Sequence, residues 1–249
     1  MNALGKFVTG AITGALLLIA PSWAADPVLI NVDAENPPFM FAQDGKAAGV
    51  YPAVIAAAFA TMNVPAKFEA KPWKRALSEM DEGKGGVGGI YKNDERAQKY
   101  DFSEPILTEN TAVYFNKGKP IDFKAVADLY GKRVGVIRGW SYGDAFDAAR
   151  KDGKISVEEV PNDKANFLKL ADGRLDAVLA IEEAGKSIIA SEKLTAIDQG
   201  KTFLASNKAH LAFNKSSKQV ELLASFSKVI AGMRQDGSLD KIVLKELSK

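Results

Sequence analysis

Short β-rich runs alternate with helical patterns along almost the whole chain after residue 27. Strands are predicted at residues 28–32, 67–70, 133–137, 156–160 and 176–181. Helices are predicted at residues 73–82, 142–150 and 164–171, and another begins near Pro52, a residue type suited to a first helical turn. Strands and helices that alternate in this way predict an α/β fold in which helices cover mainly parallel sheets.

The helix predicted at residues 164–171 has recognisable end signals. Asp163 precedes it and belongs to the residue types that cap helix N-termini, and Gly173 lies just past its end. We therefore expect Asp163 to be the N-cap of this helix.

Two β-like runs, residues 112–117 and 210–215, share the ending Phe-Asn-Lys. They bracket a segment that has its own pattern of strands and helices. Two strands that leave one lobe and return to it explain this arrangement, although a three-residue match can also arise by coincidence.

The first residues are predicted to be a signal peptide. Lys6 is the only charged residue before an apolar run at residues 7–20, and Ser22-Trp23-Ala24 forms a small-x-small cleavage pattern. We expect residues 1–24 to be removed before Ala25, and a retained membrane anchor is the alternative. An exported chain without cysteine fits a soluble protein of the bacterial periplasm.

The composition argues against several functional classes. The chain has 249 residues and a formal net charge of +2, with no basic block that would suggest a nucleic-acid partner. It has no cysteine, and His210 is its only histidine, so we expect no metal site. Residues 83–88 match G-x-G-x-x-G but follow a helix rather than a strand, so we expect no dinucleotide cofactor. With Gly89, these glycines are expected to allow close approach of the backbone to a packed helix or a ligand.

Arg96 is the main candidate ligand-binding residue. It lies on a short polar turn within residues 93–105, and its guanidinium is a fork of donors shaped for a carboxylate. The alternative is a surface ion pair with Asp94 or Glu95.

Other candidates lie at the ends of predicted strands and helices. Trp73 would either pack in the core or form a flat wall beside a ligand, and Arg75 would share an anionic ligand with Arg96. Residues 138–143 follow a strand and begin a helix, where backbone N–H groups attract carboxylates, although Ser141 could simply cap that helix. Glu182 lies at the carboxyl end of a strand, where α/β sheets bind ligands.

A series of short motifs supports a family resemblance. They are residues 37–41 (PPFMF), 44–49 (DGKAAG), 95–96 (ER), 100–105 (YDFSEP), 129–139 (LYGKRVGVIRG), 173–178 (GRLDAV) and 235–242 (QDGSLDKI). In this order and spacing, from residue 28 to residue 247, the chain resembles the periplasmic solute-binding proteins of polar amino-acid ABC transporters, the bacterial extracellular solute-binding proteins of family 3.

The resemblance implies a two-lobed periplasmic binding protein fold of type II. Lobe I would comprise residues 25–113 and 212–249, and lobe II residues 114–211, with two crossing strands as the hinge. A small polar ligand would bind in the cleft and favour its closure. The protein would act as a monomer with a membrane permease as its partner, without a cofactor and without catalytic activity.

The resemblance also implies roles for individual residues. Arg96 matches the arginine that holds the ligand α-carboxylate, and Gly89 matches a position whose backbone faces the ligand. Trp73 falls near an aromatic residue that flanks the ligand side chain. Trp140 and Ser141 fall on the helix start of lobe II that also binds the carboxylate.

The chain departs from the family pattern at several of these positions. Tyr91 stands where the family usually has threonine, and Asn36 stands where many members have a stacking aromatic residue. Ile181 stands where the family places the aspartate that binds the α-ammonium, and the neighbouring Glu182 is its possible substitute. The predicted ligand site includes Tyr91 and Glu182. It also includes Asp33, which follows the first predicted strand.

The sequence therefore predicts capture of a small carboxylate-bearing polar solute, such as an amino acid, for an ABC transporter. Because Ile181 replaces an aspartate, a carboxylate ligand without an ammonium group is also compatible with the pattern. Two alternatives remain, namely a periplasmic enzyme similar to cyclohexadienyl dehydratases with Glu182 as general acid, and a sensory adaptor that presents its ligand to a membrane receptor.

Overall fold

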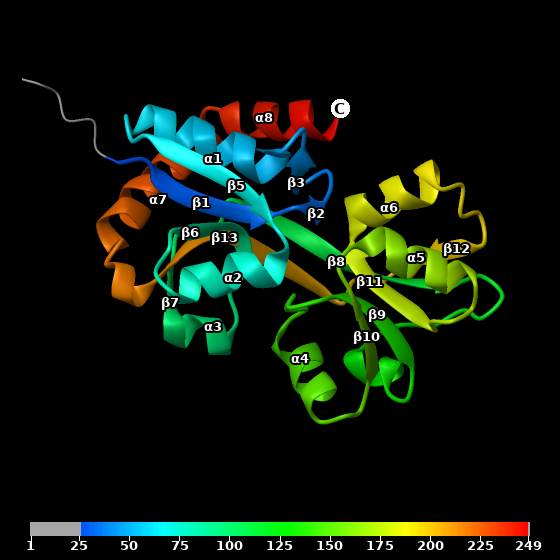
Figure 1. Ribbon diagram of the computed structural model, residues 1–249. Helices are drawn as coiled ribbons and strands as arrows, with labels where there is room; N and C mark the ends of the chain where they lie inside the picture. The colour runs from blue at the N-terminus through cyan, green and yellow to red at the C-terminus, as the bar shows by residue number, and fades with distance from the viewer. Residues whose placement is uncertain (1–25, 249) are drawn as a thin grey trace, which may run out of the picture.

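The computed structural model describes residues 26–248 and shows two α/β lobes joined by a pair of long strands (Figure 1). The predicted signal peptide, residues 1–24, lies outside the described residues. Within residues 26–248, no helix combines the length and the apolar character that a membrane span requires.

Lobe I contains a sheet whose parallel centre is β1 (Val28–Asp33), paired with β5 (Ala66–Lys71) on one side and β6 (Gly86–Tyr91) on the other. A small separate sheet follows β1, formed by β2 (Glu35–Asn36), β3 (Met40–Gln43) and β4 (Lys46–Ala48). The helices of this lobe are α1 (Val50–Thr61), α2 (Trp73–Asp81), α3 (Asp94–Lys99), α7 (Val220–Gln235) and α8 (Ser238–Leu247).

Lobe II repeats the same arrangement on a smaller scale. Its parallel strands are β9 (Arg133–Ile137), β10 (Ser156–Val160) and β11 (Ala177–Ile181), with β9 in the middle. Its helices are α4 (Asp144–Lys151), α5 (Asp163–Ala171) and α6 (Glu182–Ser191), and a short 3-10 helix, Val126–Leu129, precedes β9. The short strand β12 (Ile197–Gln199) leads back towards lobe I.

The lobes are joined by β8 (Leu107–Asn116) and β13 (Ala205–Asn214), which pair with each other in antiparallel fashion. Beyond that pairing, β8 continues into lobe II beside β11 and β12, whereas β13 continues into lobe I beside β6 and β7 (Tyr100–Phe102). The predicted lobe boundaries, 113/114 and 211/212, fall inside these strands. The Phe-Asn pair of each Phe-Asn-Lys ending forms the last two residues of β8 and of β13. The repeated sequence therefore lies at the same place in both crossing strands.

The predicted α/β class is confirmed, and one large apolar cluster extends through both lobes while a second, smaller one lies in lobe II. In lobe I, α1 and α7 pack together through Phe59 and Phe226, whose ring centroids are 5.9 Å apart. In lobe II, Tyr114 of β8 packs against Phe167 of α5 at 4.9 Å. The larger cluster includes Trp73 and Tyr91 of lobe I together with Trp140 and Tyr142 of lobe II, so apolar packing joins the lobes in addition to the crossing strands.

The N-terminus of α5 corrects one prediction. Asn162, not Asp163, is the N-cap, because the Asn162 side-chain oxygen accepts a hydrogen bond from the Ala165 N–H at 3.1 Å. Both residue types are good caps, and the structure uses the first of the pair. Asp163 therefore becomes the first residue of the helix, and its side chain is buried.

Candidate functional site

The loop between β9 and α4 makes the densest set of contacts between the lobes. The carbonyl oxygen of Gly139 accepts hydrogen bonds from Trp73 Nε1 and from Arg96 Nη2, both at 3.1 Å. Two residues further on in the same loop, Ser141 Oγ accepts a hydrogen bond from Asn93 Nδ2 at 3.0 Å. Three side chains of lobe I thus converge on one backbone loop of lobe II.

Trp140, in the same loop, lies at the centre of an aromatic group. Its ring centroid lies 6.2 Å from that of Trp73, 6.0 Å from that of Tyr91 and 6.3 Å from that of Tyr142. Its indole Nε1 donates a hydrogen bond to Asp33 Oδ2 at 3.2 Å. The aromatic rings come from both lobes, so they form a continuous wall only when the lobes are together.

Arg96 is held in place by the short helix α3. Asn93 caps this helix by accepting a hydrogen bond from the Arg96 N–H at 2.8 Å. The guanidinium then donates to the Tyr91 carbonyl oxygen at 2.8 Å and, across the cleft, to the Gly139 carbonyl oxygen. Burial lowers the pKa of Arg96, although an arginine stays protonated at any physiological pH. The result is a fixed cation in the cleft.

The alternative predicted for Arg96, an ion pair with a neighbour on the same turn, is not formed. Glu95 pairs instead with Lys99 at 3.0 Å on the solvent side of α3. The N–H of Asp94 donates to Asp144 Oδ1 across the cleft at 3.4 Å. Arg96 is therefore bonded to carbonyl oxygens rather than to the neighbouring acids.

Ser141 does not cap α4, because that helix begins at Asp144 with Gly143 as its N-cap. Its hydroxyl instead donates to Asp147 Oδ2 at 2.5 Å, and Asp147 Oδ1 accepts the Tyr142 N–H at 3.3 Å. These bonds fix the loop that carries Gly139 and Trp140.

Asp33 is a buried acid at the end of β1. Its carboxylate accepts the Trp140 indole N–H and, at 3.1 Å, the backbone N–H of Glu35. Burial raises the pKa of Asp33 to about 6, although these hydrogen bonds by themselves lower it. Asp33 thus links the first strand of lobe I to the loop of lobe II.

The ring and the hydroxyl of Tyr91 have different partners. Its ring contacts Trp140, whereas its hydroxyl donates to Glu109 on the crossing strand β8. Tyr51 of α1 donates to the other oxygen of the same carboxylate at 2.5 Å. Burial raises the pKa of Glu109 to about 7. Tyr91 was predicted to belong to the ligand site, and its hydroxyl is directed to the hinge strand.

Gly89 is explained by packing and strand geometry. The pairing of β6 with β13 shifts between His210 and Leu211, which leaves Gly89 as the extra residue of a β-bulge at φ 77°. A Cβ at this position would lie 2.7 Å from the Tyr51 ring and 3.0 Å from the sulfur of Met40. The glycine permits the close approach of Tyr51.

We expect Gly89→Ala to lower the free energy of unfolding by roughly 2–3 kcal/mol, since it adds both backbone strain and a clash. Urea denaturation measures this loss. Gly153→Ala is the matched control, because Gly153 has a similar φ of 71° but nothing within 4 Å of its added Cβ. Equal losses in the two variants would show that packing against Tyr51 is unimportant.

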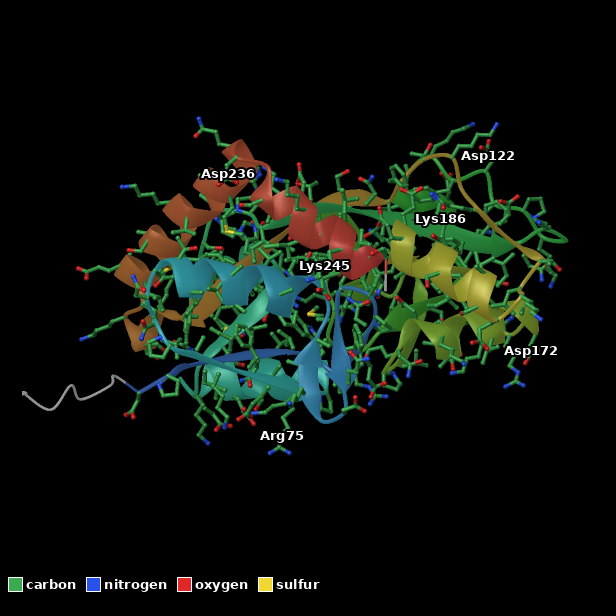
Figure 2. All side chains as sticks on the ribbon, turned by 90° about the horizontal axis from the view of Figure 1, so that it is seen from above. Arg75, Asp122, Asp172, Lys186, Asp236 and Lys245 are labelled. Carbon is green, nitrogen blue, oxygen red and sulfur yellow. The ribbon has the colours of Figure 1, made fainter. Side chains whose placement is uncertain are left out.

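Arg75 and Glu182, predicted as ligand-binding residues, lie apart from this group. Arg75 has a side chain that is 72% exposed, pairs with Glu79 at 3.2 Å and points away from the body of the protein (Figure 2). The Glu182 carboxylate is held in lobe II by Lys186 at 2.5 Å and by Gln199 at 3.3 Å. The residues that the structure does bring together are Asp33, Trp73, Tyr91, Arg96, Trp140 and Ser141.

Asp163, which was not among the predicted site residues, lies between the lobes. It lines a cavity of about 350 Å³ between residues 35–37 of lobe I and helices α5 and α6 of lobe II. The signal in the sequence was the tandem Asn162-Asp163, since only one of two adjacent cap-forming residues can be the N-cap. Among residues 26–248, no group of His, Cys, Asp and Glu side chains is arranged to hold a metal ion.

Comparisons with known proteins agree with this architecture. The family model of the bacterial extracellular solute-binding proteins, family 3, matches residues 28–249. The L-cystine-binding protein TcyJ of Escherichia coli (strain K12) is 27% identical over 218 residues, which cover 86% of this chain and 80% of TcyJ.

Two solved structures are similar along most of their length. A histidine kinase sensor domain with similarity to periplasmic binding proteins matches with a TM-score of 0.79 and 25% identity, over 90% of this chain and 97% of that domain. An ancestral arginine-binding protein bound to arginine matches with a TM-score of 0.75 and 26% identity, over 89% of this chain and 98% of that protein.

Proposed function

Because the chain belongs to the bacterial extracellular solute-binding proteins, family 3, we propose that it captures a small carboxylate-bearing polar solute between its lobes. An amino acid or a related compound is the proposed class of ligand. The observation that carries the proposal is the convergence of Arg96 and Trp73 of lobe I on Gly139 of lobe II. A guanidinium has more N–H donors than its two carbonyl bonds use, and a carboxylate is their natural acceptor.

The aromatic wall supports the same proposal. Trp73, Tyr91 and Trp140 form a group of apolar rings beside the Arg96 contacts, while Asp33 provides a polar group bonded to Trp140. Ligand pockets commonly combine such apolar walls with a few fixed polar groups. Because the wall is complete only when the lobes meet, binding would favour the closed form, with a hinge in β8 and β13 near residues 113/114 and 211/212.

The biological setting follows from the relatives. Proteins that resemble this chain include one named for L-cystine binding and one solved with arginine. We propose that the chain is exported by a signal peptide at residues 1–24, acts as a monomer in the periplasm and delivers its solute to the permease of an ABC transporter. The likeness to a histidine kinase sensor domain supports a second candidate, presentation of the solute to a membrane receptor.

An enzymatic role receives less support. The general acid considered for it, Glu182, is ion-paired with Lys186, and that hydrogen bond lowers the pKa of Glu182. A general acid at neutral pH needs the opposite shift. We therefore propose that the protein binds its solute without transforming it.

A thermal-shift screen of residues 25–249 against amino acids, organic acids and polyamines tests the proposal. A true ligand at 100 times its dissociation constant is expected to stabilise the folded protein by about 2.7 kcal/mol, which raises the melting temperature measurably. Incubation with the ligand followed by chromatography checks that it stays intact. The absence of a stabilising solute from all three classes contradicts the proposal.

A further inference from the structure

Asp163 is a buried carboxylate without a partner inside the protein. Its side chain belongs to the first turn of α5, and the residue is only 5% exposed. Neither of its oxygens has a hydrogen-bond partner among residues 26–248. Buried carboxylates are normally paired or hydrogen-bonded, because an isolated charge is costly to remove from water.

The cations near Asp163 are already engaged elsewhere. Lys164, the next residue, pairs with Glu192 of α6 at 2.7 Å. Burial raises the pKa of Asp163 to about 8, and the nearby acid Asp33 across the cleft adds to this effect rather than opposing it. No positive charge of the described chain therefore balances this carboxylate.

Asp163 borders a cavity between the lobes, and its carboxylate oxygens are covered while the lobes are together. It lines the cavity of about 350 Å³ between the lobes, which lies at the lower end of the size range of ligand pockets. Asn36, on the lobe I side of the same cavity, is only 2% exposed, and its Nδ2 has no acceptor among residues 26–248. Two residues that line the cavity from opposite lobes thus carry an unused carboxylate and an unused amide donor.

The cavity and Arg96 lie on different sides of the interface between the lobes. Arg96 is on α3, which Figure 1 shows beside α2 and facing α4, whereas Asp163 is on α5, beside α6 and facing the strand β2. A ligand whose carboxylate binds Arg96 has to extend across this interface for its other end to meet Asp163.

We propose that Asp163 binds a positively charged group, an ammonium or a guanidinium, at the end of the ligand remote from its carboxylate. This inference rests on the proposed solute-binding function and narrows its ligand class to cationic carboxylates. Where the ligand carries an oxygen near that cation, the Asn36 amide donates a hydrogen bond to this oxygen.

Four probes of equal chain length separate the contributions of the two possible cations. L-Lysine carries an α-ammonium and a terminal ammonium, L-norleucine only the first, 6-aminohexanoate only the second, and hexanoate neither. Isothermal titration calorimetry with the mature protein is expected to show that the terminal ammonium strengthens binding by roughly tenfold or more, in both pairs that differ in it.

The variant Asp163→Asn keeps the size of the side chain and removes the charge, so the gain from the terminal ammonium is expected to disappear. Asp172→Asn is the matched control, because Asp172 lies at the other end of α5, pairs with Arg174 at 3.1 Å and stands at the surface (Figure 2). This control is expected to retain the full gain. Circular dichroism verifies that both variants are folded.

The possible outcomes separate this inference from the proposed function. Equal affinity of the wild type for probes with and without the terminal ammonium, or an unchanged gain in Asp163→Asn, overturns the cation site while solute binding stands. The same holds if the thermal-shift screen finds a ligand that carries no cation. Failure of every solute in the screen to bind overturns the proposed function itself, and the cation site falls with it.

Discussion

Arg96→Ala is expected to weaken binding of the solute by roughly 100-fold. Two losses combine, because the ligand carboxylate loses a charge-assisted partner and the closed form loses the hydrogen bond from Arg96 to Gly139. Isothermal titration calorimetry with the ligand from the screen measures the change. Small-angle X-ray scattering adds an independent readout, since the variant should no longer become more compact when ligand is added.

Arg75→Ala is the control for this prediction. Arg75 lies one helix earlier in the chain, and its guanidinium contacts Glu79 at the surface of α2. Its removal takes away the same charge without touching the cleft, so affinity and compaction should match the wild type. Arg96→Lys keeps the charge but loses the fork of donors, and an intermediate affinity is expected. An Arg96→Ala protein that binds and closes like the wild type would contradict the role of Arg96.

The helices and strands could be predicted from the sequence because hydrophobic periodicity and helix-end signals depend on residues that are close together in the chain. Residues 133–137 and 156–160 form strands with the predicted bounds, and Pro52 lies in the first turn of α1. The prediction of the α5 N-cap fails because two adjacent residues both carry the signal of a helix N-cap. Asn162 and Asp163 can both cap α5, and only the packing of lobe II against lobe I decides which side chain is buried.

The candidate site was less predictable, because its geometry depends on contacts between residues far apart in the chain. The convergence of Trp73 and Arg96 on Gly139 joins positions separated by 66 and 43 residues. Tyr91 was recognised as unusual, but its hydroxyl is directed by Glu109, which no local pattern singles out. Gly89 was expected to allow close approach to a packed helix or a ligand, and the structure shows the packed helix, since Tyr51 of α1 lies against it.

The stability of the free protein is expected to fall as the pH rises from about 4.5 to about 8, by several kcal/mol in total. Three buried acids cause the effect. Burial raises the pKa of Asp33 from 3.8 to about 6, that of Glu109 from 4.5 to about 7, and that of Asp163 from 3.8 to about 8. In this range the unfolded chain releases protons that the folded protein retains, so each increase in pH favours the unfolded state.

His210 acts in the opposite direction below pH 6.5. Its ring is buried against the Ser103 carbonyl, and burial lowers its pKa from 6.5, so the unfolded state binds the extra proton there. Above pH 6.5 this opposing contribution is small. The interval from pH 6.5 to pH 8 therefore isolates the buried acids, and Asp163 is the group whose pKa lies at its upper end.

Urea denaturation at pH 6.5 and pH 8 tests the expectation with Asp163→Asn beside the wild type. One group that ionises only in the unfolded state changes the stability by about 1.4 kcal/mol per pH unit, so the wild type should lose up to about 2 kcal/mol through Asp163 over this interval. The variant should show a flatter dependence and exceed the wild type at pH 8, whereas Asp172→Asn should follow the wild type. Parallel curves for the wild type and Asp163→Asn would mean that Asp163 is ionised and stabilised in the free protein, and the unbalanced carboxylate on which the cation site rests would not exist.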